Sequence, residues 1–219
     1  MVNNRPTVYN TASVYKESGG GGDRPEPPLG FELVGAVYWN NTLNAFTSSG
    51  FTLDIKGTNN GTISQKIYKP NAGKQNATTS LFILGDWNNK YCYCTANTYI
   101  NSIGIKNNST TKGFTKDVTS SGIHEIVLNK NNCSFDTTSF TDVAYTEINN
   151  VGYCFPFPIN DRYKPDPIFA MYEFKIVDSS NNLKSYIIPV KRIADGLVGI
   201  MDVISGRTYL DSKFSYYTI

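Results

Sequence analysis

From Leu29 onward, the chain alternates short apolar segments with clusters of turn-forming residues. The clusters include Asn-Asn-Gly, Ser-Ser-Gly and Lys-Asn-Asn, which accept positive φ or hydrogen-bond their own backbone. Strand-length segments separated in this way, about 8–12 residues apart, are typical of a β-sandwich or barrel. The stretch 155–167 is rich in proline and predicts a loop. The predicted strands are 31–38, 51–56, 62–68, 80–85, 90–95, 98–105, 123–129, 168–177, 184–190, 197–203 and 206–210.

The side-chain pattern within these segments supports strands rather than helices. Phe51, Leu53 and Ile55 alternate with polar residues, as expected for a strand with one buried face. Aromatic residues make up 13% of the chain and charged residues only 17%, whereas a soluble domain usually has about 25% charged residues. Segments rich in Ala, Leu, Glu and Lys are nearly absent. We therefore expect an all-β protein built as an antiparallel β-sandwich.

Residues 1–28 differ in composition from the rest. Gly19 to Gly22 form a four-glycine run, which allows almost any backbone angle. Pro25, Pro27 and Pro28 follow and favour an extended spacer. The sequence thus predicts an N-terminal anchoring arm and linker at 1–28 and a single β-sandwich at 29–219. The arm residues expected to dock onto a partner are Arg5, Val8, Tyr9, Val14 and Tyr15.

Charge and cysteine usage exclude several classes of partner. The net charge is +2 with no basic stripe, so we expect no nucleic-acid partner. No apolar run reaches the roughly 18 residues of a membrane span, and residues 1–6 lack an apolar signal core. We expect no cofactor and no metal. The four cysteines, which are expected to be free thiols with a four-cysteine zinc site as the alternative, are Cys92, Cys94, Cys133 and Cys154.

The patterns of common active sites are missing from the sequence. A paired-carboxylate glycosidase strand of the Glu-x-Asp-x-Glu type does not occur, and Glu173 and Asp178 are placed for opposite faces of one strand. His124, the single histidine, lies in a predicted strand. We expect a neighbouring strand to satisfy its ring, and no G-x-S-x-G elbow accompanies it. The sequence therefore predicts a protein that is not an enzyme.

Aromatic residues near turns are the candidates for sugar binding, because an exposed ring can stack on a sugar. Trp87, flanked by Asp86 and Asn88, is the first candidate, with Tyr91 beside it. Trp39 is another. The alternative is that these rings fill the core between two sheets.

The C-terminal segment carries a family resemblance. It contains Lys175-Ile-Val-Asp178, Pro189-Val-Lys-Arg192, Asp195-Gly-x-x-Gly199 and Asp202, followed by Gly206 and Tyr209. This pattern resembles the C-terminal hairpins of concanavalin A-like, laminin-G-like domains of gut bacteria and their phages. The resemblance implies a concanavalin A-like jelly roll over residues 29–219.

The N-terminal string NNRPTVYNTASVYKESGGGG is similar to leader segments of structural proteins from crAss-like gut phages. This resemblance implies a virion structural protein, a head fibre or capsid decoration, made in the host cytoplasm. Its implied partners are capsid or tail proteins, bound through the arm. It also implies a homo-oligomer, with a trimer as the expected form. The alternative function is a glycan- or receptor-binding tail fibre or adhesin module.

Overall fold

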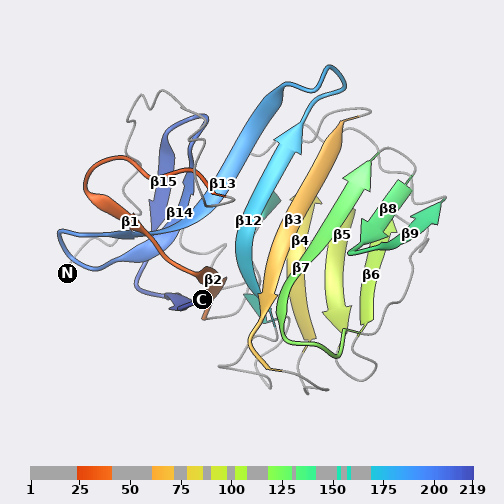
Figure 1. Cartoon of the computed structure of the whole chain (residues 1–219), viewed down its shortest axis with the longest axis horizontal. Coiled ribbons are helices and arrows are strands. Elements are labelled where there is room, and N and C mark those ends of the chain that lie inside the picture. The colour runs from red at the N-terminus through yellow and green to blue at the C-terminus, as the bar shows by residue number, and fades with distance from the viewer. Residues whose placement is uncertain are drawn as a thin grey trace.

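The computed structural model describes residues 24–40, 61–71, 78–85, 90–97, 102–107, 118–129, 132–141, 152–153, 157–158 and 169–219. Every regular element in this part of the chain is a β-strand (Figure 1). The strands are β1 (Phe31–Leu33), β2 (Ala36–Trp39), β3 (Thr62–Lys69), β4 (Thr78–Gly85), β5 (Lys90–Asn97), β6 (Ser102–Asn107), β7 (Gly122–Asn129), β8 (Asn132–Phe135), β9 (Thr138–Thr141), β10 (Gly152–Tyr153), β11 (Phe157–Pro158), β12 (Ala170–Val177), β13 (Leu183–Arg192), β14 (Val198–Asp202), β15 (Arg207–Leu210) and β16 (Phe214–Tyr217).

These strands form two antiparallel sheets, which confirms the predicted all-β sandwich. The larger sheet has 11 strands, with the path β15-β14-β13-β12-β3-β7-β8-β9 and with β1, β2 and β16 paired off it. The smaller sheet has five strands, in the order β10-β4-β5-β6 with β11 on β4. In the view of Figure 1, β4, β5 and β6 lie behind β3, β7, β8 and β9.

The inner face of the larger sheet is built from matched rows of side chains. The buried residues of β3 alternate along the strand, and antiparallel register places each one beside buried residues of β7 and β12. Directly paired residues share a face, so the rows form one continuous buried layer that is apolar except for Gln65 and His124. The rows are Ile63 with Leu128 and Ile176, Gln65 with Ile126 and Phe174, and Ile67 with His124 and Met171.

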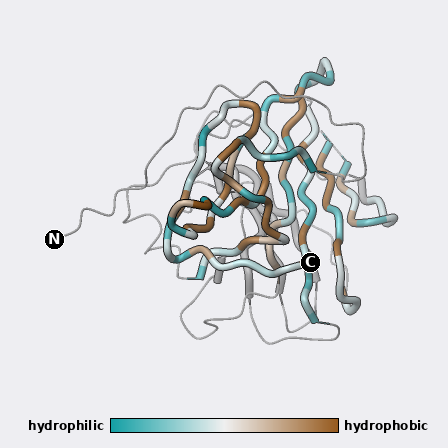
Figure 2. Tube along the Cα trace, turned by 60° about the vertical axis from the view of Figure 1, so that its left-hand side comes forward, coloured by the Kyte–Doolittle hydropathy of each residue, from teal (hydrophilic) through white to brown (hydrophobic). Residues whose placement is uncertain are grey.

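A second apolar cluster lies on the opposite face, where β13, β14 and β15 meet. The buried members are Tyr186, Ile188, Val190, Met201, Val203 and Leu210. Phe31 and Leu33 of β1 pack against this cluster, because β1 pairs with the end of β13. Strand β13 is therefore buried on both faces over most of its length. Figure 2 shows the same contrast for the described residues, with brown, hydrophobic tube inside the fold and teal, hydrophilic tube at projecting hairpin turns.

Three aspartates stabilise the C-terminal hairpin turns. Asp178 accepts the N–H groups of Ser180 and Asn182 between β12 and β13. Asp195 accepts the Leu197 N–H, next to Gly196 at φ +73°. Asp202 accepts the N–H groups of Tyr186 and Ile204. The turns predicted from the C-terminal pattern are thus present, since each carboxylate satisfies backbone donors that the strand ladder leaves open.

Most predicted strands match an observed strand within a few residues, and three kinds of difference occur. The predicted strand 31–38 breaks at Gly35, because β1 pairs with β13 whereas β2 pairs with β12 and β16. The segment 155–167, predicted to be a loop, contains the two-residue strand β11. Strands β8, β9, β10 and β16 were not predicted, since they are too short to show a period. The predicted strand 51–56 lies outside the described residues.

Candidate functional site

The outer face of the larger sheet carries the polar side chains of its central strands. Lys66 of β3 pairs in register with Glu173 of β12 and with Glu125 of β7, so these three residues share that face. Lys175 lies two residues beyond Glu173 on the same strand and therefore also points outward. Two lysines and two glutamates thus meet on one surface, where their charges balance.

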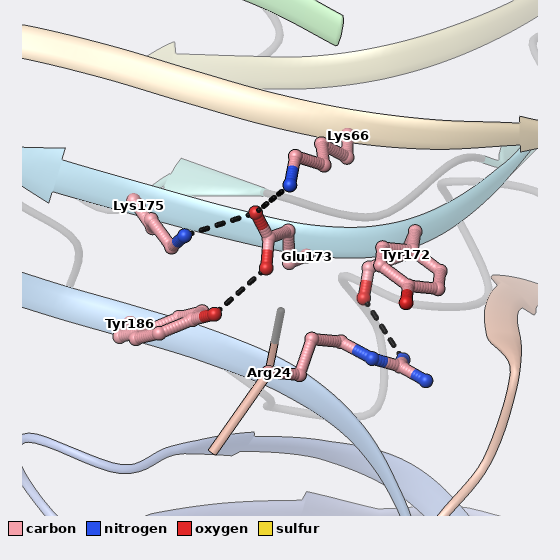
Figure 3. Close-up of polar contacts among 6 residues, drawn as sticks. All are labelled: Arg24, Lys66, Tyr172, Glu173, Lys175 and Tyr186. Atoms are coloured by element: carbon pink, nitrogen blue, oxygen red, sulfur yellow. Dashed lines mark hydrogen bonds and ion pairs between the residues drawn. The ribbon is translucent and has the colours of Figure 1, made fainter. Parts of the chain in front are cut away.

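Glu173 is the centre of this group (Figure 3). Glu173 as a whole residue is only 2% exposed to solvent. One carboxylate oxygen lies 3.0 Å from the Lys175 ammonium and 3.2 Å from that of Lys66. The other accepts a 2.7 Å hydrogen bond from the Tyr186 hydroxyl. A buried carboxylate needs such partners, because desolvation alone would strongly disfavour its charge.

Arg24 sits beside this group and joins the N-terminal segment to the sheet (Figure 3). Its Nη1 donates to the carbonyl oxygens of Val34 at 3.0 Å, Gly35 at 2.8 Å and Tyr172 at 3.2 Å. Its guanidinium carbon lies 3.9 Å from the centroid of the Tyr172 ring, within cation–π range. Tyr172 lies at an irregularity in the β12–β3 register, between Met171 and Glu173. Arg24 therefore binds one carbonyl group of β12 and two of the link between β1 and β2.

Three half-buried tyrosines lie near the same face. The Tyr217 ring centroid is 5.2 Å from that of Tyr38 and 5.8 Å from that of Tyr68. Tyr68 has the same strand parity as Lys66 on β3 and so points outward with it. We call Lys66, Tyr68, Glu173, Lys175 and Tyr217 the outer polar face. It combines aromatic rings with paired charges.

His124 lies in β7, as predicted, and each of its ring nitrogens lies within hydrogen-bond distance of an oxygen. Nδ1 is 2.9 Å from Oδ2 of Asp136, and Nε2 is 3.2 Å from the Ser120 carbonyl oxygen. The ring also stacks on Phe135, with centroids 5.5 Å apart. Asp136 occupies the turn between β8 and β9 at φ +49° and accepts the Glu125 N–H. The histidine therefore fastens the β8–β9 hairpin to β7.

Cys133 is a buried free thiol, as predicted for it. Burial raises the pKa of its thiol to about 12. No cluster of three metal-ligating side chains occurs within the part of the chain that the structure describes, which leaves out the side chains of Cys92, Cys94 and Cys154. On β3, burial lowers the pKa of Lys69, whose ammonium donates to the Asn71 carbonyl.

Of the three residues predicted to bind glycans, only Trp39 has a side chain that the structure describes. Trp39 is 1% exposed, and its ring meets Phe214 edge-on at 5.0 Å. It is a core residue and offers no stacking surface, because the strand β2 turns it inward. Tyr91 lies in β5, of which only the backbone is described, and Trp87 lies outside the described residues. The predicted anchoring residues Arg5, Val8, Tyr9, Val14 and Tyr15 also lie outside them.

Comparison with known proteins finds no matching family model, no matching curated protein and no matching solved structure. Among the described residues, no helix is long and apolar enough to cross a membrane. The resemblance to concanavalin A-like phage domains therefore stays a prediction from the sequence, beside an all-β sandwich that the structure establishes.

Sequence patterns did not single out Lys66, Tyr186 or Arg24. Their roles come from pairing between distant strands, as in the contact of Arg24 with Tyr172, 148 residues apart. One signal was available: a glutamate and a lysine alternate with apolar residues in Tyr172-Glu-Phe-Lys175. An acidic residue inside a strand otherwise rich in apolar residues indicates a partner across the sheet.

Proposed function

We propose that this chain is a non-catalytic structural protein of a virion, a head fibre or capsid decoration. In this proposal the N-terminal arm and linker, residues 1–28, tether it to capsid or tail proteins, and the β-sandwich projects from the particle. The protein would act on the virus particle and would need no cofactor.

The observation that supports this proposal is the set of contacts that hold Arg24 on the sandwich. The residue follows directly on Gly19 to Gly22 and Asp23, and it is bound to the carbonyls of Val34, Gly35 and Tyr172. In the sequence, a glycine run that permits many backbone conformations is thus followed closely by a residue that is fixed on the sandwich. Force or motion transmitted through the arm would reach β2 and β12 rather than fray the fold from its first strand.

Co-sedimentation of the full chain with purified capsids of the virus that encodes it tests the tether. The test variant replaces Val8, Tyr9, Val14 and Tyr15 by serine within the intact chain. We expect it to remain in the supernatant while the unchanged chain sediments with the particles. Thermal unfolding of both proteins provides the control, because the head should melt at the same temperature. Equal sedimentation of the two proteins would overturn the proposal.

A second candidate function is glycan binding by the outer polar face. The observation that favours it is the contact of Tyr68 and Tyr217 next to the paired charges of Lys66 and Glu173. Tyrosine rings can stack on a sugar while nearby charged groups hydrogen-bond its hydroxyls.

A glycan microarray followed by calorimetry with the strongest ligand tests this function. We expect Tyr68→Ala to abolish binding, whereas Tyr216→Ala, in β16 and of opposite strand parity to Tyr217, leaves it unchanged. Trp87→Ala tests the site predicted from the sequence. Loss of binding only in Trp87→Ala would move the site away from the outer polar face.

A further inference from the structure

Exposed apolar side chains gather around strand β1. Among the described residues, five large apolar side chains are exposed, and three of them lie here. Leu29, just before β1, is fully exposed, and Ile193 is 63% exposed. The two lie at one end of the strand, because the Ile193 N–H donates a 2.9 Å hydrogen bond to the Gly30 carbonyl. Tyr216 is 40% exposed and lies further along, with its ring centroid 6.0 Å from the Lys191 ammonium.

An ion pair links these apolar groups. Lys191 pairs in register with Glu32 at the middle of β1, and its ammonium forms an ion pair with the Glu32 carboxylate. The hydrogen bond that Lys191 donates to Glu32 within this ion pair raises the pKa of the Lys191 ammonium. We call Leu29, Glu32, Lys191, Ile193 and Tyr216 the β1 strip. It is apolar at one end, aromatic at the other, and carries one charge of each sign between them.

We propose that the β1 strip is a contact surface for a second copy of this chain. Grouped exposed apolar side chains on a soluble protein mark an interaction site more often than scattered ones do. The charges of the strip indicate the kind of partner. Nucleic acids and anionic membranes select net positive surfaces, whereas this strip carries one positive and one negative charge.

A surface with both signs can complement itself. Two copies related by a two-fold axis present the same strip to each other. In that arrangement Glu32 of one copy faces Lys191 of the other, and the apolar end of one strip meets the aromatic end of its copy. The centre of such a contact would hold the charged pairs of Glu32 and Lys191, with apolar-to-aromatic contacts on either side of it.

Because the β1 strip lies near Arg24, contact between two copies would also affect how their arms attach to the particle. Leu29 follows the Arg24 anchor by a few residues, so two joined copies start their arms close together. Two linked arms bind a surface more tightly than one, because the second binding event becomes intramolecular. This consequence rests on the proposed tether, whereas the contact between copies does not.

Sedimentation velocity of the full chain over about 1–200 µM, the range for weak self-association, tests the inference. We expect the weight-average mass to rise with concentration from the monomer value of 24.3 kDa toward at least twice that value. Leu29→Asp and Ile193→Asp, combined in one chain, should abolish the rise. Both side chains are exposed, so the head should stay folded, and thermal unfolding checks this.

Ile123→Asp is the matched control, because Ile123 is also exposed but lies on β7. It should associate like the unchanged chain. Two results would overturn the inference: a mass that stays at the monomer value over the whole range, or association that survives the double substitution. The second result would locate self-association elsewhere and would leave the capsid experiment unaffected.

Discussion

The hydroxyl of Tyr186 donates a 2.7 Å hydrogen bond to the buried carboxylate of Glu173. The tyrosine belongs to two environments at once. Its ring is part of the apolar cluster under β1, and its hydroxyl completes the charged group of the outer polar face. The ring also lies 4.3 Å from the Lys175 ammonium. The Tyr186 side chain thus contacts both the apolar cluster under β1 and the charged group around Glu173.

Removing the charge of Glu173 should destabilise the fold. In Glu173→Gln, the ammonium groups of Lys66 and Lys175 lose their shared carboxylate, and we expect a loss of about 1–3 kcal/mol in the free energy of unfolding. Tyr186→Phe should cost about 1.5 kcal/mol, because it leaves a buried carboxylate oxygen without its donor. Urea unfolding measures both values. A double variant that loses the full sum would contradict a direct interaction between the two residues.

Arg24 should contribute to the stability of the head. Arg24→Ala removes a donor to three carbonyl groups and a cation–π contact, so we expect a loss of about 2 kcal/mol. Arg24→Lys should lose less, since an ammonium keeps the charge but lacks the planar fork. Chemical denaturation of the full chain gives these values. Equal stability of Arg24→Ala and the unchanged chain would show that the anchor does not hold the start of the head.

The sequence predicted the local parts of this fold, because local rules govern them. The turn at Asp195-Gly196 and the alternation in β3 follow from neighbouring residues alone. The register that sets Lys66 opposite Glu173 follows from pairing of strands that are distant in the chain, with an irregularity near Tyr172. Short-range patterns cannot reveal such a pairing, so the outer polar face was missed.

Two single residues show the same limit. Trp39 stands beside Asn40, a neighbour typical of a surface turn, yet its ring is buried against Phe214. Arg24 lies between a glycine run and a proline, and it was predicted to be part of a spacer. Both residues owe their places to partners far along the chain. His124 could be predicted, because a lone histidine in a strand usually finds a structural partner.

Acid should weaken the turn between β12 and β13. The pKa of Asp178 is held well below its usual range, chiefly by the hydrogen bond from the Asn182 backbone and then by Lys184. A lowered folded-state pKa gives stability that is present above the unfolded pKa, about 3.9, and is lost as the pH falls below it. The difference in melting temperature between the unchanged chain and Asp178→Asn should therefore be largest at pH 6 and shrink progressively as the pH falls below about 4.

Lys184→Gln serves as the control for this measurement. It removes the ion pair with Asp178 and keeps the backbone hydrogen bonds, so most of the acid-dependent difference should remain. A gap between the unchanged chain and Asp178→Asn that is constant from pH 6 to pH 2.5 would show that the carboxylate charge does not stabilise the turn.

The Cys133 thiol should resist alkylation in the folded protein. Burial raises its pKa to about 12, so it stays protonated at pH 8, and the thiolate is the reactive form. Peptide mapping after treatment with iodoacetamide should show Cys133 labelled only in guanidinium chloride. Addition of EDTA should leave this labelling pattern unchanged. Labelling of Cys133 in the folded protein only after EDTA treatment would instead support the alternative of a four-cysteine zinc site.

The two glycines of the Asp195-Gly-x-x-Gly199 pattern should differ sharply in their tolerance of alanine. A Cβ at Gly199 would overlap the Tyr209 carbonyl oxygen and approach the Leu210 Cα to 2.9 Å. The β14–β15 pairing would have to separate, so we expect Gly199→Ala to cost more than about 3 kcal/mol. Gly196 has open space around its Cα but a φ of +73°, which costs an alanine about 1–2 kcal/mol. Urea unfolding of both variants distinguishes close packing from backbone conformation, and equal losses would show that β15 does not press on β14 at this point.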